Sequence, residues 1–235
     1  MHIFYQPLIG EGVNYLDEEE SSHAVKVLRL KEQGLIQVVD GKGRFFNSLI
    51  TRANPRKCEF QVNEIIIDHP GKKHYIHLAI APIKNNDRME WLVEKSVEFG
   101  IDEISFLNCK HSERKDINTG RIEKKAITAM KQSLKANLPK LNSTLPFSTF
   151  IQEKAAEEQK FIAYVDETIP QHLKEVATPD KTYCILIGPE GDFSPDEISL
   201  AKTNGFHPVS LGKSRLRTET AGMAACLILN LINNF

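Results

Sequence analysis

The chain has 235 residues, of which 41% are hydrophobic, so it is long enough to bury the core of one large domain or two modest ones. Lys and Arg number 30 against 31 Asp and Glu, which excludes binding to nucleic acid through overall charge and leaves only local clusters of basic residues for that role. No apolar run approaches the roughly 18 residues of a membrane span, and the first residues lack a signal-peptide pattern. We therefore expect a cytoplasmic protein without a membrane partner.

The first 70 residues predict a small β-rich domain. Strand-like apolar runs lie at 35–39, 44–51 and 58–67. Turn residues separate them, and one short helix is expected from about Glu19 to Leu28. The segment from His69 to Lys73 has the composition of a linker. We therefore predict one domain at 1–70 and a second at 74–235.

From residue 74 onward, short apolar strands alternate with helices. The expected strands are Tyr75 to Ala81, Glu103 to Leu107, Phe161 to Val165, Tyr183 to Ile187 and Pro208 to Leu211. Such alternation over about 160 residues favours an α/β domain, in which helices cover a mainly parallel sheet.

Local signals set the expected helix ends in this second domain. Asp87 and Glu90 have the spacing of a capping box, and the helix they open should end at Gly100. A second helix is expected from about Arg121 to Asn137, stopped by Pro139. A short helix is expected around 171–177.

The cysteines predict neither disulfides nor a zinc site. Cys58, Cys109, Cys184 and Cys226 are far apart in the sequence, and no two of them form a C-x-x-C pair. We expect buried reduced thiols and no bound metal.

Two glycine-bearing loops near the carboxyl end carry the most information. Gly188 to Phe193 follows a strand, and Ser194 with Glu197 forms a capping box that opens the next helix. Ligands of open α/β sheets bind at such strand ends. Gly188 and Gly191 permit close backbone approach or positive φ, although a lone G-x-x-G more often forms an ordinary tight connection.

A second loop favours ligand binding over an ordinary tight connection. Gly212 ends a strand, and the following residues place Arg215 and Arg217 at the start of the last helix, 219–233, with Thr218 as the expected N-cap. That helix end already carries positive partial charge, so two arginines there indicate an anionic partner or a developing negative charge. The helix is apolar on nearly every side, which predicts a dimer interface.

These motifs carry a family resemblance. GPEGDFSPDEI and LGKSRLRTETA resemble the SPOUT class of S-adenosylmethionine-dependent RNA methyltransferases, and more narrowly the ribosomal RNA small subunit methyltransferase E family. The stretch from His23 to Gly43 resembles that family's PUA-like RNA-binding domain, and the stretches 84–101 and 129–136 resemble helices of its catalytic domain.

The resemblance implies a fold and an activity. It implies a SPOUT-type α/β domain with a deep trefoil knot, preceded by a small PUA-like β barrel, and a homodimer. The implied reaction is methylation of N3 of a uridine in 16S rRNA, either free or within the small ribosomal subunit, with S-adenosyl-L-methionine as the cofactor. The implied donor-binding residues are Ile187, Gly188, Pro189, Glu190, Gly191, Leu211, Gly212, Leu216 and Thr218.

Methylation at N3 removes a proton and leaves negative charge on uracil O2 and O4, which positioned cations stabilise. Arg217 and Arg215 are the candidates for that stabilisation. Glu219 is a candidate proton acceptor, but a first-turn acidic residue also serves the helix dipole. Glu190 either orients the ligand or pairs with a nearby arginine. The target base must leave its stack to reach the methyl group.

Basic residues outside the loops are candidates for RNA contact. On the helix 121–137, Arg121, Lys124, Lys131 and Lys135 recur at helical spacing and form a one-sign stripe that suits phosphates. The other candidates are Lys26, Arg29, Arg52 and Arg114. Taken singly, each of these basic residues is weak evidence for RNA contact, because a solvated helix face or an exposed loop also accounts for it.

Two further functions stay open at this stage. One is a SPOUT methyltransferase for tRNA or large-subunit rRNA, and the other is a non-catalytic RNA-binding protein of the same fold. The intact Gly188, Gly191 and Gly212 favour a working donor site. A nicotinamide-dependent dehydrogenase is disfavoured, because no G-x-G-x-x-G follows the first strand of either half.

Overall fold

The computed structural model describes residues 2–69, 71–153, 155–166 and 171–234. The chain divides into two compact units. The first unit comprises Met1–Lys72 and Ile127–Leu138, and the second comprises Lys73–Ala126 and Pro139–Phe235.

The first unit is built on a four-stranded sheet of order β1-β2-β3-β4, in which β1 is parallel to β2 and the other pairs are antiparallel. The strands are β1 (Ile3–Tyr5), β2 (Leu35–Val39), β3 (Arg44–Arg52) and β4 (Glu59–Ile67). The three predicted strands are confirmed. Strand β1 was not predicted, because its three residues are too short to form a recognisable pattern.

A helix packs against this sheet and closes its core. It begins as α1 (Glu18–Ser22) and continues directly as a π-helix, η2 (His23–Val27). A short 3₁₀ turn, η1 (Ile9–Glu11), precedes it in the chain. Asp17 caps α1 by accepting a hydrogen bond from the N–H of Glu20 at 2.7 Å. The buried core joins apolar residues of helix and sheet, including Phe4, Leu16, Ala24, Ile36, Phe46 and Phe60.

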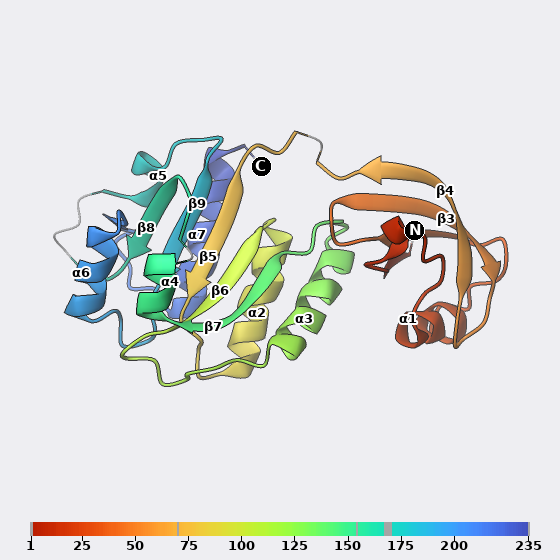
Figure 1. Ribbon diagram of the computed structural model, residues 1–235, viewed down its shortest axis with the longest axis horizontal. Coiled ribbons are helices and arrows are strands. Elements are labelled where there is room, and N and C mark those ends of the chain that lie inside the picture. Colours follow the sequence, from red (N-terminus) through yellow and green to blue (C-terminus); the bar gives the residue numbers. More distant parts are fainter. Residues whose placement is uncertain (1, 70, 154, 167–170, 235) are drawn as a thin grey trace. The chain divides into compact units, whose positions relative to one another are not determined.

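The second unit is an α/β layer structure with a six-stranded parallel sheet of order β10-β8-β9-β5-β6-β7 (Figure 1). Its strands are β5 (Tyr75–Ile80), β6 (Glu103–Asn108), β7 (Lys140–Pro146), β8 (Gln159–Ala163), β9 (Thr182–Ile187) and β10 (His207–Val209). Its helices are α2 (Asn86–Glu98), α4 (Phe147–Glu153), α5 (Leu173–Val176), α6 (Pro195–Thr203) and α7 (Thr218–Ile232). Helix α3 (Thr119–Gln132) begins in this unit, and its part from Ile127 onward is assigned to the first unit. The predicted α/β class and parallel sheet are confirmed.

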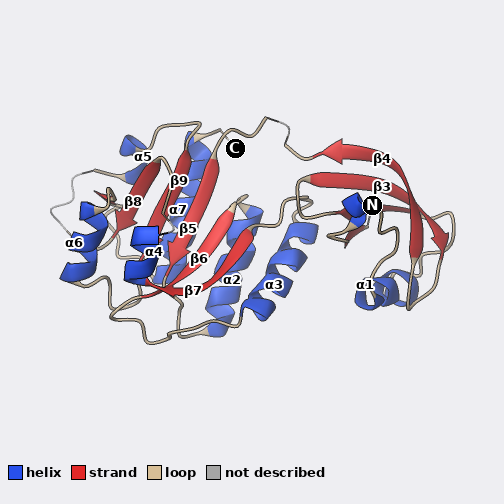
Figure 2. Ribbon diagram, in the orientation of Figure 1, coloured by secondary structure: helices blue, strands red, loops and turns tan. Residues whose placement is uncertain are grey.

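Helices cover both faces of this sheet (Figure 2). On one face, Phe147 and Phe150 of α4 and Ala201 of α6 share a core with Leu107 and Leu186 of the strands. On the other face, α7 packs against α2, β5 and β9. The fit is close at Gly222, where an added Cβ would lie 2.9 Å from Cδ1 of Ile80.

Two helix ends differ from the prediction. The N-cap of α2 is Asn85, whose side chain accepts from the N–H groups of Asp87 and Arg88, so the expected Asp87–Glu90 capping box is wrong. The predicted stop at Gly100 is confirmed, with φ of 81°. Helix α3 ends at Gln132 rather than near Asn137, because Leu134 turns the chain with φ of 55° before Pro139 is reached.

Strand β7 and helix α4 were missed. Strand β7 is an edge strand with no fully buried residue, so it lacks the apolar run that marks the central strands. Helix α4 follows it directly and is only seven residues long.

All four cysteines are buried free thiols, as predicted. Burial raises the pKa of each of them, to about 12 for Cys226. None of the helices formed by the described residues is long and apolar enough to cross a bilayer.

Candidate functional site

The loops predicted to bind a ligand leave the parallel sheet at one edge. The strands β5, β6, β9 and β10 all run in the same direction, so the connections that follow them begin at the carboxyl edge of the sheet. Ligands of open parallel sheets bind at this edge. The residues of interest lie in four connections: 81–85, 109–118, 188–194 and 210–217.

The first loop, 188–194, is partly buried and internally hydrogen-bonded. The predicted capping box is confirmed, since Ser194 Oγ accepts from the N–H of Glu197 and the Glu197 side chain accepts from the N–H of Ser194 at 2.8 Å. Neither Gly188 nor Gly191 has a positive φ; that conformation belongs to Asp192, at 61°. The two glycines instead allow close packing, because a Cβ on Gly188 would lie 3.2 Å from the Phe193 ring.

Asp192 holds this loop together. Its Oδ1 accepts from the N–H of Phe193 at 2.8 Å, and its Oδ2 accepts from the N–H of Val165 at 2.9 Å. Its own N–H donates to the carbonyl of Pro189 at 2.9 Å. These bonds offset the cost of the left-handed backbone at a residue other than glycine.

The connection after β6 lies against this first loop. The Nδ1 atom of His111 is 3.2 Å from the carbonyl oxygen of Gly191 and 3.1 Å from that of Asp192. The N–H of Lys110 donates to Oε1 of Glu197 at 2.8 Å. Sequence reasoning missed both residues, because nothing local in the sequence pairs 110–111 with 191–197.

The second loop, 210–217, keeps its arginines exposed. Gly212 has φ of 123°, and a Cβ built on it would meet nothing within 4 Å. Arg217, not Thr218, is the N-cap of α7, so the expected Thr218 cap is wrong; Thr218 is the buried first residue of the helix. Among the described residues, neither Arg215 nor Arg217 has a hydrogen-bond or ion-pair partner for its side chain.

Glu219 is buried and has a cationic neighbour. Its side chain is 9% exposed, and its Oε1 lies 3.7 Å from Nη1 of Arg88, which comes from the first turn of α2. A carboxylate in the first turn of α7 interacts favourably with the helix dipole. Arg88 was not among the predicted site residues.

The start of α2 contacts both the first loop and the first turn of α7. The N–H of Lys84 donates to Oε1 of Glu190 in the first loop at 3.4 Å, and Arg88, one turn later, pairs with Glu219 beyond the second loop. The hydrogen bonds and ion pairs of the described residues do not join the two loops directly. Glu190 was expected to orient a ligand or pair with an arginine; among the described residues its side chain accepts the N–H of Lys84 and has no arginine partner.

The basic stripe predicted on α3 carries less free charge than the sequence indicates. Arg121 pairs with Glu90 and lies 3.9 Å from Asp87, and Lys131 pairs with Glu20. Lys124 and Lys135 also have partners. Lys135 follows the end of the helix and is half-buried, so it does not continue the stripe. Glu90 and Glu20, which are distant in sequence, supply counter-charges that the pattern of the helix itself does not show.

The remaining predicted RNA contacts are scattered over exposed or half-buried positions. Lys26 lies on the exposed side of η2, and Arg29 follows it with φ of 55°. Arg52 ends β3 and lies 3.9 Å from Glu59. Arg114 is half-buried in the connection after β6.

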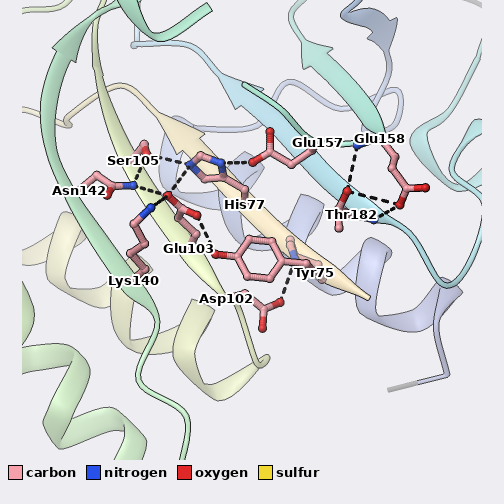
Figure 3. Close-up of polar contacts among 11 residues, drawn as sticks. Tyr75, His77, Asp102, Glu103, Ser105, Lys140, Asn142, Glu157, Glu158 and Thr182 are labelled. Atoms are coloured by element: carbon pink, nitrogen blue, oxygen red, sulfur yellow. Dashed lines mark hydrogen bonds and ion pairs between the residues drawn. The ribbon is translucent and has the colours of Figure 1, made fainter. Parts of the chain in front are cut away.

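A buried polar network crosses the sheet of the second unit (Figure 3). Glu103 is its centre, accepting from Tyr75 Oη at 2.7 Å, Lys140 Nζ at 2.8 Å and Asn142 Nδ2 at 2.5 Å. His77 bridges it to Glu157, with Nδ1 2.5 Å from Oε1 of Glu157 and Nε2 2.8 Å from Oγ of Ser105. Burial would raise the pKa of Glu103, but the bonds from Lys140, Tyr75 and Asn142 prevail and hold it below its usual value.

Three atoms of this region have the chemistry of metal ligands. The ligand atoms of His77, Glu157 and Cys184 all lie within 4.8 Å of one another. Both nitrogens of His77 already have protein partners, however, and burial keeps Cys184 a neutral thiol by raising its pKa. We therefore interpret the cluster as part of the structural network.

This network predicts a pH-dependent stability. Replacing Glu103 by glutamine is expected to lower the free energy of unfolding at pH 7 by about 1–2 kcal/mol, because hydrogen bonds to the ionised carboxylate are lost. The folded pKa of Glu103 lies below its ordinary value of 4.5, so this contribution is complete above pH 4.5 and is lost as the pH falls through the folded pKa. The difference between wild type and Glu103→Gln should therefore shrink on acidification.

Urea unfolding followed by circular dichroism between pH 7 and pH 3.5 measures this difference. The matched control is Glu32→Gln, which removes an exposed carboxylate without a hydrogen-bond or ion-pair partner among the described residues. If the difference in the free energy of unfolding between wild type and Glu103→Gln stayed constant over this pH range, the prediction would be contradicted.

Family models match both units of the chain. One described as an RNA methyltransferase domain matches residues 70–230, and one described as an RNA methyltransferase PUA domain matches residues 16–63. A curated relative from Buchnera aphidicola, named ribosomal RNA small subunit methyltransferase E, is 28% identical over 92% of this chain and 86% of its own length. The protein of that name from Aquifex aeolicus is 27% identical, with both chains covered completely.

Solved structures that are described as methyltransferases also resemble this chain. A structure from Porphyromonas gingivalis, described as a probable rRNA-methyltransferase, is 41% identical and matches with a TM-score of 0.92 over 100% of this chain and 99% of its own. A Legionella pneumophila methyltransferase solved with bound SAM is 28% identical and matches with a TM-score of 0.86, covering 98% of this chain and 97% of its own.

Proposed function

Because this chain belongs to the RNA methyltransferase family whose model matches residues 70–230, we propose that it methylates 16S rRNA of the small ribosomal subunit, with S-adenosylmethionine as the methyl donor. The proposed position is N3 of a uridine. The observation that carries the proposal is the pair of loops at the carboxyl edge of the sheet, together with the names of relatives that span nearly the whole chain.

The main chain of the two loops suits a small ligand with several donors and acceptors. Gly188 is buried, yet its N–H donates to no group among the described residues. The N–H groups of the exposed Glu190 and Gly191 and of the half-buried Leu216 are likewise unpaired among the described residues. Unpaired main-chain groups next to buried apolar residues are what a nucleoside needs for specific binding. We therefore propose Ile187–Gly191, Leu211, Gly212, Leu216 and Thr218 as the donor-binding residues.

We also propose that the second unit is knotted. Supporting contacts lie on the path from the edge strand β10 to α7, which packs against the central strands β5 and β9. On this path the N–H of Ser210 donates to the carbonyl of Gln171 at 2.9 Å, and the N–H of Leu173 donates to the carbonyl of Ser210 at 3.0 Å. The chain thus returns to the centre beside an earlier connection, as a knot requires, although knots are very rare.

The proposed chemistry assigns separate tasks to the second loop. When bound, S-adenosylmethionine supplies a methyl group that is activated by its sulfonium charge. The exposed guanidinium of Arg217, without a partner among the described residues, is available to stabilise the negative charge that uracil develops on O2 and O4. Arg215 is a second source of positive charge in the same loop. Glu219, paired with Arg88, is the candidate that accepts the N3 proton.

A homodimer is part of the proposal. On α2 and α7, which pack together, Trp91 is 40% exposed, Leu227 is 39% exposed and Leu231 is 63% exposed. An apolar surface of this kind on two adjacent helices favours a symmetric contact with a second copy of the chain.

Mapping of rRNA modifications tests the proposed function. Small-subunit rRNA from a strain that lacks the gene should contain one uridine without its N3-methyl group. Mass spectrometry detects this change as one rRNA fragment that is lighter by the mass of a methyl group. Adding the purified protein and S-adenosylmethionine should restore the methyl group. Complete methylation in the deletion strain would contradict the proposal.

A further inference from the structure

A cavity of about 180 Å³ lies within the second unit, and neither predicted loop lines it. Its walls come from the first turns of α2, the connection after β6 and the first turns of α3. All of these segments belong to the same compact unit. Polar and apolar groups both line it, and its hydrogen-bonding groups are strongly unbalanced.

Arg114 contributes an uncompensated positive charge to this cavity. Its Nε donates to the main-chain carbonyl of Asp116 at 2.8 Å, and its Nη1 donates to Oδ1 of Asn86. Both partners are neutral, and no carboxylate pairs with Arg114 among the described residues. The guanidinium is therefore held in one orientation while its charge remains available to a ligand.

Two asparagine amides add further donors. An arginine can only donate, so Asn86 must turn its oxygen toward Arg114, which leaves its NH₂ group for other partners. Asn118 is in the same situation, because its Oδ1 accepts from the N–H of Arg121 at 3.1 Å. Neither NH₂ group has a partner among the described residues.

The acceptors of the cavity are few. Glu90 lines it, but this carboxylate pairs with Arg121. The isoleucines Ile117 and Ile122 supply an apolar wall and no hydrogen-bonding side chain. The cavity thus presents a free charge on Arg114 and two amide donors, and its complement is an anionic group rich in acceptor oxygens.

The cavity lies beside the candidate donor site. Asn86 is in the first turn of α2, between Lys84, which contacts the first loop, and Arg88, which pairs with Glu219. An anionic group bound at Asn86 and Arg114 would therefore lie next to the site at which the methyl group is transferred.

Building on the proposed function, we infer that this cavity is a phosphate subsite for the RNA strand, which holds the phosphodiester of a nucleotide close to the target uridine. Arg114 binds the phosphate through a charged guanidinium, and the amides of Asn86 and Asn118 donate to its other oxygens. The apolar wall accommodates the adjoining ribose or base. The subsite sets the register of the strand, while the base is selected elsewhere.

A linkage scan tests the subsite. An rRNA fragment that contains the methylated uridine is prepared with a neutral methylphosphonate at one linkage at a time. Its affinity is measured for the wild type, Arg114→Gln and the matched control Lys115→Gln, which removes one charge from the adjacent residue, outside the cavity. At one linkage near the uridine, neutralisation should weaken binding by about 10-fold for the wild type and Lys115→Gln, but by less than about 2-fold for Arg114→Gln.

The salt dependence provides a second readout. With unmodified RNA, Arg114→Gln should lower the slope of log Kd against log salt concentration by about 0.7, the value for one phosphate of a single strand. If glutamine disturbs the loop, as judged by the melting temperature, Arg114→Lys keeps the charge and should keep the slope while losing part of the affinity.

The outcomes separate the subsite from the proposed function. If neutralising a linkage weakened binding of the wild type and of Arg114→Gln by the same factor at every position, the phosphate subsite alone would be overturned, provided that the wild type methylates the fragment normally. A wild-type protein that neither binds nor methylates the fragment would overturn both proposals.

Discussion

Arg217→Ala is expected to lower the rate of methyl transfer by about 100-fold or more, with the affinity for S-adenosylmethionine changed by less than about 2-fold. The guanidinium acts on charge that develops only when the uridine loses its N3 proton, so its loss affects the transition state rather than donor binding. The change should not unfold the protein, because the Arg217 side chain makes no capping hydrogen bond to α7.

Tritium-methyl transfer to rRNA measures the rate, and calorimetry measures the donor affinity. Lys213→Ala is the matched control, since it removes one exposed positive charge from the same loop. Arg215→Ala shows whether the second arginine shares the task. Normal turnover by Arg217→Ala would remove this residue from the mechanism.

Gly191→Val is expected to weaken binding of S-adenosylmethionine by about 100-fold or more. A Cβ on Gly191 would lie 3.0 Å from Cβ of His111, so a branched side chain has no room on that side. It would displace either the loop or His111, whose Nδ1 contacts the carbonyl oxygens of Gly191 and Asp192. Either displacement moves the main-chain groups proposed to bind the donor.

Calorimetric titration with S-adenosylmethionine measures this effect. Gly191→Ala is the graded control, because its single methyl group requires a shift of only a few tenths of an ångström at His111, and it should bind more weakly than wild type but better than valine. A melting temperature close to that of the wild type would show that the fold is retained. Donor affinity unchanged in Gly191→Val would contradict the proposed site.

The elements that the sequence predicts well are those whose signals are local. Central strands such as β5 and β9 are mostly apolar runs, and the Ser194–Glu197 capping box needs only residues three positions apart. Asp87 and Glu90 show the same spacing, yet Asn85 caps that helix instead. Local spacing alone does not decide between neighbouring residues that can both act as caps.

The candidate site depends on contacts between distant residues, which no local pattern contains. Arg88 with Glu219, Lys84 with Glu190 and His111 with Gly191 are each separated by 80 residues or more along the chain, about the size of a small domain. The neutralisation of Arg121 by Glu90 and of Lys131 by Glu20 is likewise invisible to a count of charges. The sequence therefore located the loops but not the residues that surround them.

The buried cysteines have a practical consequence for experiments on this protein. Each native thiol is shielded in the folded chain and resists ionisation, whereas Ser214 lies exposed in the second loop. A fluorophore carried on a maleimide would thus react selectively with a cysteine introduced at position 214. Movements of that loop can then be followed by optical spectroscopy, without removing any of the natural sulfhydryl groups.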